Sequence, residues 1–403
     1  NGLEKRPKLR FPGFDEPWNT ALLSDYFVKS TKKNSDGMIS NVICNSAKQG
    51  LIPQREYFDK DIANSDNTNG YYIIESNDFV YNPRKSADAP YGPISSYQYP
   101  EAGIVSPLYL CFRAKREINP LYFEWYFRSS TWHRYIYMSG DSGARHDRVS
   151  IKDDVFFAMP INVPSAKEQK RISLFLDAIE RRIETQRTLV ETLKKYKRGV
   201  VRSLLSPENC GLKEVQWQCD TIGNLGSFIK GAPLSKADIS ETGTPFILYG
   251  ELYTTYHEVI TSVVRKTEAV VEQVYHSMVG DVLIPTSGET SEEISTASCV
   301  MLPGVILAGD LNIFRSTKID GRIMSYILNH IVNGNIARIA QGKSVVHVQA
   351  SEISKIEISY PDPETQIRII KVLEAISNRI ESCEKELNHL TKMRNSLLQQ
   401  LFI

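Results

Sequence analysis

The sequence has few of the residue patterns that build metal sites or disulfide frameworks. Its 403 residues include six cysteines, with no Cys-x-x-Cys pair, and seven histidines, with no His-Glu-x-x-His motif. Structural zinc sites and disulfide-stapled folds both depend on such spacings. We therefore expect reduced thiols and no bound metal in this chain.

Long apolar runs and an export signal are also missing. Runs such as Val305–Ala308 are far shorter than the roughly 18 residues that a membrane-spanning helix needs. No basic segment followed by an apolar stretch opens the chain, so we expect no export. The content of 41% hydrophobic and 24% charged residues excludes a disordered chain. These features predict a cytoplasmic protein with no membrane partner, and the length predicts two or three domains.

The motifs of common nucleotide-dependent enzymes are missing as well. The sequence has no Asn-Pro-Pro-Tyr motif and no Gly-x-Gly-x-x-Gly loop, and Gly342-Lys343-Ser344 lacks the spacing of a Walker loop. The acidic pairs Asp153-Asp154 and Glu292-Glu293 have no third metal ligand at a useful spacing. We therefore expect no catalytic residues in this chain.

What the sequence does contain is an internal repeat. The segment 164–205 reappears without a gap, 197 residues later, as the segment 361–402. Agreement at one fixed offset is the signature of a duplicated architecture. Thirteen positions are identical at this offset, and the paired residues include Pro164/Pro361, Gln169/Gln366, Arg182/Arg379 and Leu204/Leu401.

Both copies of the repeat predict a long helix. Each begins after a proline, which suits a helix start. Apolar residues then recur at alternating steps of four and three, the pattern of a coiled-coil seam. We expect the two helices to pair as an antiparallel coiled coil, although each stripe could instead dock onto its own globular neighbour. The expected interface residues are Ile172, Leu176, Ile179, Ile183, Val190 and Leu193 in the first copy and Ile369, Leu373, Ile376, Ile380, Leu387 and Leu390 in the second.

The seam also carries a cation at the same heptad position in each copy, Lys197 and Arg394. Long cationic side chains at such positions usually extend their charged ends to the surface, and we expect this here. The alternative is that they set the helix register or bind a partner.

The segments that precede the helices correspond loosely. Asp78-Phe79-Val80 resembles Asp281-Val282-Leu283, and Val149-Ser150-Ile151 resembles Val346-His347-Val348. Apolar runs broken by Gly, Pro, Asn and Asp are typical of short strands. The predicted fold class is α+β, with two mixed α/β domains alternating with two long helices in a pseudo-twofold internal repeat. The expected boundaries are 1–163 for the first domain, 164–206 for the first spacer helix, 207–360 for the second domain and 361–403 for the second spacer helix.

Two similar but unequal domains held apart by a rigid helix pair would act as a ruler. A helix of about forty residues is roughly 60 Å long, which corresponds to about one and a half turns of B-DNA. A fixed spacing favours DNA binding, because half-sites one helical turn apart lie on the same face of the duplex and can be bound together. Because the two domains differ in sequence, the hypothesis is a bipartite and asymmetric DNA site.

The order of these features resembles the specificity subunit of type I restriction–modification systems. The resemblance covers nearly the whole chain, and no single motif carries it alone. It rests on the duplicated domain–helix order and on the segments Gln169–Ile172, Gln366–Ile369, Pro7–Phe14, Arg148–Ile151 and Ala158–Ile161.

The resemblance implies a non-catalytic subunit whose two target-recognition domains each read one half of a split double-stranded DNA sequence. The helices would fix the gap between the halves and dock two methyltransferase subunits, which use S-adenosylmethionine. Restriction and translocase subunits would join the larger complex. The resemblance implies no cofactor in this chain itself.

Long polar and basic side chains recognise bases by hydrogen bonds to the base edges in the DNA grooves. Loops rich in such residues are therefore candidate DNA contacts. In the loop Gly143–Arg148, Arg145 could bind guanine and Arg148 could hold a phosphate. Tyr71-Tyr72 could stack on bases or pack in the core. For every candidate, a solvated surface residue is the alternative. The candidates are Lys33, Arg84, Arg145, His146 and Arg148 in the first domain and Lys230, Thr286, Ser287, Lys343, Ser344, His347 and Gln349 in the second.

The charge distribution does not favour DNA binding by this chain alone. The net charge is +1, whereas a stand-alone DNA-binding protein usually carries a basic excess. The segment 207–360 carries a net charge of −6, and the segment 164–206 carries +6. Either the charge is segregated to faces, or partner subunits make most of the phosphate contacts. A protein-interaction scaffold that spaces two binding domains without touching nucleic acid therefore stays open.

Overall fold

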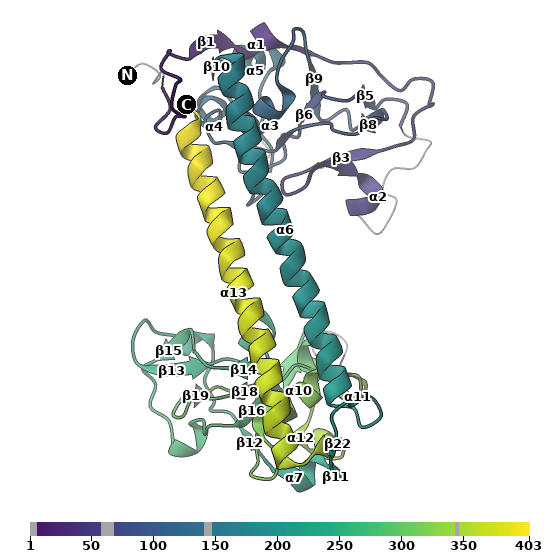
Figure 1. Ribbon diagram of the computed structural model, residues 1–403, viewed down its shortest axis with the longest axis vertical. Coiled ribbons are helices and arrows are strands. Elements are labelled where there is room, and N and C mark those ends of the chain that lie inside the picture. Colours follow the sequence, from purple (N-terminus) through teal and green to yellow (C-terminus); the bar gives the residue numbers. More distant parts are fainter. Residues whose placement is uncertain (1–5, 58–67, 141–146, 343–345) are drawn as a thin grey trace. The chain divides into compact units, whose positions relative to one another are not determined.

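The computed structural model describes residues 6–57, 68–140, 147–342 and 346–403. It divides into two compact units, one formed by Asn1–Arg187 with Lys385–Ile403 and the other by Thr188–Glu384. The two longest helices, α6 (Ala166–Leu204) and α13 (Pro363–Leu401), each contribute residues to both units (Figure 1). The sequence predicted a long helix in each of these two segments, and the ends of α6 and α13 lie within two residues of the expected ones.

Both long helices begin with the same local hydrogen bond. At the start of α6, the side-chain amide of Gln169 donates to the carbonyl oxygen of Pro164 at 3.0 Å. At the start of α13, Gln366 donates to the carbonyl oxygen of Pro361 at 2.8 Å. These bonds tie the first helical turn to the strand that precedes it, and they explain why a proline and a glutamine recur at this spacing in the sequence.

The first unit consists of short strands with helices on their surface. Strands β2, β9, β6 and β7 form a four-stranded sheet in that order, while β1 pairs with β10, β3 with β4 and β5 with β8. The elements of the domain, from the N-terminal side, are β1 (Asn19–Leu22), α1 (Leu23–Tyr26), β2 (Phe27–Lys29), β3 (Ile43–Ser46), β4 (Gly50–Pro53), α2 (Gln54–Tyr57), β5 (Tyr72–Ile74), β6 (Phe79–Tyr81), β7 (Ile94–Ser96), β8 (Gly103–Val105), β9 (Leu110–Ala114), α3 (Pro120–Arg128), α4 (His133–Ser139), α5 (Asp153–Phe157) and β10 (Pro160–Val163).

The core of the first unit is rich in aromatic rings, and the end of the chain completes it. Phe27 packs edge-on against Phe112 with ring centroids 5.3 Å apart. Leu398, Leu401 and Phe402, from the end of α13 and the residues after it, are buried in the same hydrophobic cluster. The first domain therefore needs side chains that lie almost three hundred residues further along the sequence.

The second unit follows a similar order of elements. Its main sheet has five strands in the order β12-β20-β16-β18-β14, and smaller sheets are formed by β15-β13-β19, by β11-β22 and by β17-β21. The elements are β11 (Trp217–Thr221), α7 (Ile222–Leu225), β12 (Ser227–Lys230), η2 (Lys236–Asp238), β13 (Thr244–Ile247), α8 (Glu251–Thr254), β14 (Val259–Ile260), β15 (Arg265–Thr267), η3 (Gln273–Tyr275), β16 (Asp281–Pro285), β17 (Ser287–Gly288), α9 (Ser291–Ile294), β18 (Ser298–Val300), β19 (Ile306–Leu307), β20 (Leu311–Arg315), α10 (Gly321–His330), α11 (Asn333–Ile339), β21 (Val346–His347), α12 (Ala350–Ile353) and β22 (Glu357–Pro361).

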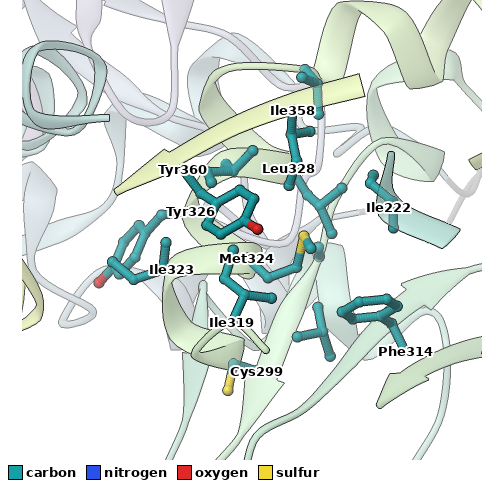
Figure 2. Packing of buried hydrophobic residues seen from close by; sticks show 14 of the residues in the cluster. Ile222, Cys299, Phe314, Ile319, Ile323, Met324, Tyr326, Leu328, Ile358 and Tyr360 are labelled. Atoms are coloured by element: carbon teal, nitrogen blue, oxygen red, sulfur yellow. The ribbon is translucent and has the colours of Figure 1, made fainter. Parts of the chain in front are cut away.

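Helix α10 is the centre of the second core. Figure 2 shows its side chains Met324 and Leu328 packed between Phe314 of β20 and Ile358 of β22. The helix approaches the sheet closely because its first residue is Gly321, where a Cβ atom would lie 2.0 Å from the carbonyl oxygen of Gly280. This position therefore requires glycine.

In each unit, a buried aspartate binds an arginine with both carboxylate oxygens. In the first unit, Arg113 of β9 donates to Asp78 at 2.6 and 2.7 Å. In the second, Arg315 of β20 donates to Asp281 at 2.8 and 2.7 Å. Both aspartates are almost fully buried. The sequence similarity noted between the segments that begin at Asp78 and Asp281 therefore coincides with one shared interaction.

The residues of the predicted helix stripe are buried or half-buried. Those near the start of each helix join the core of a globular domain: Ile172 and Leu176 lie in the aromatic cluster of the first unit. Ile369 and Leu373 lie in the cluster around α10. The remaining predicted interface residues are buried at Ile179, Ile183, Val190 and Ile380 and half-buried at Leu193, Ile376, Leu387 and Leu390.

Within the described residues, no helix is both long and apolar enough to span a membrane.

Candidate nucleic-acid interface

In the second unit, the structure brings most of the described candidate residues to one end of the main sheet. Lys230, at the end of β12, lies opposite Asn312 of β20, and its ammonium group donates to the Asn312 side-chain oxygen at 2.8 Å. Asn312 is fully buried, and its amide donates in turn to the carbonyl oxygen of Val348 at 3.3 Å. A buried side chain therefore links Lys230 to the segment that carries His347 and Gln349.

Two segments predicted as separate candidates form a small antiparallel pair at this end. Ser287 of β17 lies opposite His347 of β21. The backbone N–H of Val348 donates to the carbonyl oxygen of Thr286 at 3.0 Å, which extends the pairing. The side chains of His347 and Gln349 are exposed, whereas Ser287 is buried. His347 and Gln349 can therefore reach a ligand, and Ser287 contributes backbone geometry.

The electrostatics at this end are mixed. Burial lowers the pKa of the Lys230 ammonium below its ordinary value, and the nearby charge of Asp310 opposes part of that shift. Asp310 itself is exposed and has a left-handed backbone with φ of 59°. An exposed carboxylate beside the lysine weakens the attraction for a phosphate, which agrees with the net acidity of this domain.

The first unit has the same backbone pairing with different side chains. Arg84 and Arg148 face each other in an isolated antiparallel bridge. The N–H of Val149 donates to the carbonyl oxygen of Pro83 at 2.9 Å, as Val348 does to Thr286 in the second unit. Like charges directly opposite each other destabilise a strand pair. Two facing arginines therefore favour an anion between or beside them.

Arg148 also borders a cavity of about 470 Å³. Its Nε atom is buried and has no hydrogen-bond partner among the described residues, and a carboxylate oxygen of Asp147 lies 4.0 Å away. A buried donor without a partner is costly and needs an explanation. The cavity is lined by Lys29, Tyr72, Tyr81, Tyr109, Arg148 and Asp153, together with several apolar and backbone groups.

An ion pair also lies at the wall of the cavity. Lys29, the last residue of β2, donates to Asp153 at 2.5 Å, and this hydrogen bond raises the pKa of the Lys29 ammonium. Asp153 belongs to the first turn of α5. The sequence pointed to neither Lys29 nor Asp153 as a DNA contact. The one sequence feature that could have identified Lys29 as a candidate was its position at the polar end of a strand.

Lys33 lies close to the same cavity, because its backbone forms an isolated bridge with Tyr72. The candidates Arg145, His146, Lys343 and Ser344 lie outside the described residues. Of the tyrosine pair, Tyr72 is half-buried and lines the cavity. Among the described residues there is no group of three or more possible metal ligands.

The comparisons with known proteins agree on one family. The profile of the type I restriction modification DNA specificity domain matches residues 214–392. The putative type I restriction enzyme MjaX specificity subunit of Methanocaldococcus jannaschii is 23% identical over 305 residues, which cover 71% of this chain and 68% of that protein.

Two solved structures share the fold along nearly the full length. One, from a study of complex assembly and conformational transition of a type I restriction–modification system, has a TM-score of 0.60 at 15% identity and covers 98% of this chain and 99% of its own. The type I S subunit from M. genitalium has a TM-score of 0.57 at 15% identity and covers 99% of both chains. The resemblance to specificity subunits of type I restriction–modification systems is thus confirmed, and it is strongest over residues 214–392, which match the model of the DNA specificity domain.

Proposed function

We infer that this chain is the DNA specificity subunit of a type I restriction–modification complex. It recognises the target sequence and carries no catalytic residues of its own. The observation that carries this conclusion is the match of residues 214–392 to the DNA specificity domain. The solved structures are similar to this chain along nearly its whole length, so the shared fold also includes the first half, which the domain match does not cover.

The chain consists of two duplicated recognition modules, with the domains 1–163 and 207–360 each followed by a spacer helix at 164–206 and 361–403. Three shared features support this duplication. They are the terminal strand pairs β1–β10 and β11–β22, the buried aspartate–arginine pairs, and the proline–glutamine hydrogen bond at the start of each long helix.

The two modules read different sequences, so the DNA site is bipartite and asymmetric. At equivalent backbone positions the first domain has Arg84 opposite Arg148, and the second has Ser287 opposite His347. Arginine pairs with guanine or phosphate through two parallel hydrogen bonds, whereas histidine and glutamine offer single or adenine-directed contacts. Because the two domains present different hydrogen-bonding side chains from equivalent backbone positions, they select different bases.

The long helices pair as an antiparallel coiled coil and set the gap between the half-sites. Ion pairs between α6 and α13 support this pairing inside each unit. In the first unit, Arg182 binds Glu386 at 2.6 Å and Arg394 binds Glu180 at 2.8 Å. In the second, Lys194 binds Glu384 at 2.6 Å. Charges that flank an apolar seam and pair across it fix the register of two helices.

The partners are double-stranded DNA, two methyltransferase subunits that hold S-adenosylmethionine, and restriction/translocase subunits in the full complex. The acidic second domain supports the view that methyltransferase subunits make many of the phosphate contacts, because phosphate neutralisation supplies most non-specific affinity. We expect this chain alone to bind DNA weakly.

Salt titration separates this function from that of a protein scaffold. DNA binding by the complex with its methyltransferase subunits should fall steeply between 50 and 200 mM salt, by about 10³-fold for six or more phosphate contacts. Arg84→Gln should reduce the slope of log K against log salt by about 1, because it removes one phosphate contact. Lys213→Gln, at an exposed position after α6, is the matched control with an unchanged slope. Assembly that is insensitive to salt, with no measurable DNA affinity, would favour the scaffold.

A further inference from the structure

The seam cation Lys197 does not extend to the surface as its sequence pattern predicts. Its ammonium group donates to Oε2 of Glu258 at 2.8 Å and lies 5.3 Å from the ring centroid of Tyr326. The side chain is only 12% exposed. Glu258 belongs to the globular part of the second unit, just before β14, so this contact joins the spacer helix α6 to the recognition domain.

Glu258 is bound from a second direction. His330, the last residue of α10, lies with Nε2 2.8 Å from Oε1 of Glu258. A carboxylate only accepts hydrogen bonds, so His330 carries a proton on Nε2. Burial by itself would raise the pKa of the Glu258 carboxyl, but the hydrogen bond from His330 and the charge and hydrogen bond of Lys197 together lower it well below its usual range. The carboxylate is therefore charged and held between two donors.

The backbone of Glu258 is fixed as well. Its carbonyl oxygen accepts from the N–H of Cys299 in β18 at 2.8 Å and from the hydroxyl of Ser325 in α10 at 2.7 Å. The acceptor for Lys197 is thus attached rigidly to the main sheet and to the central helix of this domain.

The repeat explains why Lys197 makes this contact. At the offset of 197 residues, Lys197 corresponds to Arg394, and Glu180 corresponds to Ser377. Arg394 binds Glu180, so in the first unit the seam cation joins helix to helix. A serine hydroxyl cannot form an ion pair, so Lys197 has no carboxylate at the equivalent place on α13 and binds the domain instead.

We propose that Lys197, Glu258 and His330 are positioning residues that fix the orientation of the second recognition domain on the spacer helix, and thereby the gap length that the subunit accepts. This proposal rests on the proposed function. Apolar packing is non-directional, whereas charge-assisted hydrogen bonds constrain angle as well as distance. An extra base pair moves a half-site by about 3.4 Å and rotates it by roughly 35°, so the tilt of the domain decides which gap fits.

The test uses the assembled complex with methyltransferase subunits and the target duplex found by selection. Affinity is measured on duplexes with the selected gap and with one base pair added or removed. The wild-type complex should bind the altered duplexes roughly tenfold more weakly, the loss usual for one mismatched base pair. In Lys197→Met and in Glu258→Gln, this preference should fall below about threefold, while the base preference inside each half-site is kept.

Two further variants make the result decisive. Lys195→Met changes an exposed lysine on the same helix that belongs to none of the helix-to-helix ion pairs described above, and it should keep the wild-type gap preference. If a single variant does not fold, the double variant Lys197→Met with Glu258→Leu replaces the buried charges by apolar side chains, which such sites tolerate. Folded variants that keep the tenfold gap preference overturn the proposal. A wild-type complex without any sequence preference overturns the proposed function as well.

Discussion

Phe402→Ala is expected to destabilise the first unit by about 3–5 kcal/mol. The ring of Phe402 is 2% exposed and packs against Tyr122 and Tyr126, with centroid distances of 5.6 and 6.1 Å. Leu398 and Leu401 are buried in the same cluster. Because a domain is stable by only about 5–15 kcal/mol, removal of residues 398–403 should unfold the first unit altogether.

Hydrogen exchange measured peptide by peptide in rising urea resolves the two units. Phe402→Ala should lower the protection of peptides in the sheet of β2, β9, β6 and β7 and leave those around α10 unchanged. Gln399→Ala, at an exposed position near the end of α13, should change stability by less than about 0.5 kcal/mol. Equal loss of protection in both units, or none in either, would contradict the assignment of the chain end to the first core.

Asp281→Ala should destabilise the second unit by about 3 kcal/mol, the lower end of the range for breaking a buried ion pair. The carboxylate of Asp281 is 1% exposed and accepts from Arg315 and from the N–H of Met278 at 2.8 Å. Removing it leaves the guanidinium and one backbone donor without their acceptor. Arg315 is 25% exposed, so water reduces the cost.

Urea denaturation of the variants measures this effect. Asp78→Ala should destabilise the first unit by less, because Asp78 binds Arg113 and the N–H of Glu75 but Arg113 also has an ion pair with the Glu75 side chain at 2.8 Å. Glu352→Ala, which removes the exposed pair with Lys355, should change stability by at most about 1 kcal/mol. A similarly small effect of Asp281→Ala would show that the buried pair contributes no more than a surface one.

The sequence allowed the long helices to be predicted closely, because a heptad stripe and a proline-bounded start are local signals. It could not reveal that Leu401, the last residue of the stripe, is buried in the core of the first unit, or that Phe402 beside it packs against Tyr122. The contact between Tyr122 and Phe402 joins residues 280 positions apart, and no periodicity records it. The same limit applies to Lys197, whose partner Glu258 lies outside the helix.

The sequence indicated which segments form the candidate interface, but it did not give the correct correspondence of residues between the two domains. The sequence equated Val149-Ser150-Ile151 with Val346-His347-Val348, whereas the hydrogen bonds give Val149 the role of Val348. The stretch from Val149 to Pro164 is two residues longer than the stretch from Val348 to Pro361, so a comparison at the helix offset of 197 misplaces the two segments by two residues. The facing pair Arg84 and Arg148 depends on a strand pairing over 64 positions, which local composition does not encode.

The most direct test of the central claim is selection from a pool of random duplexes by this chain assembled with its methyltransferase subunits. Sequencing of the bound fraction should show two short, unlike elements separated by a fixed gap. Replacing residues 1–163 with the corresponding domain of another specificity subunit should then change one element and leave the other and the gap intact. If the bound fraction shows no enriched element, or if the replacement alters both elements, the two domains do not recognise separate elements at a distance set by the helices, and the account is wrong.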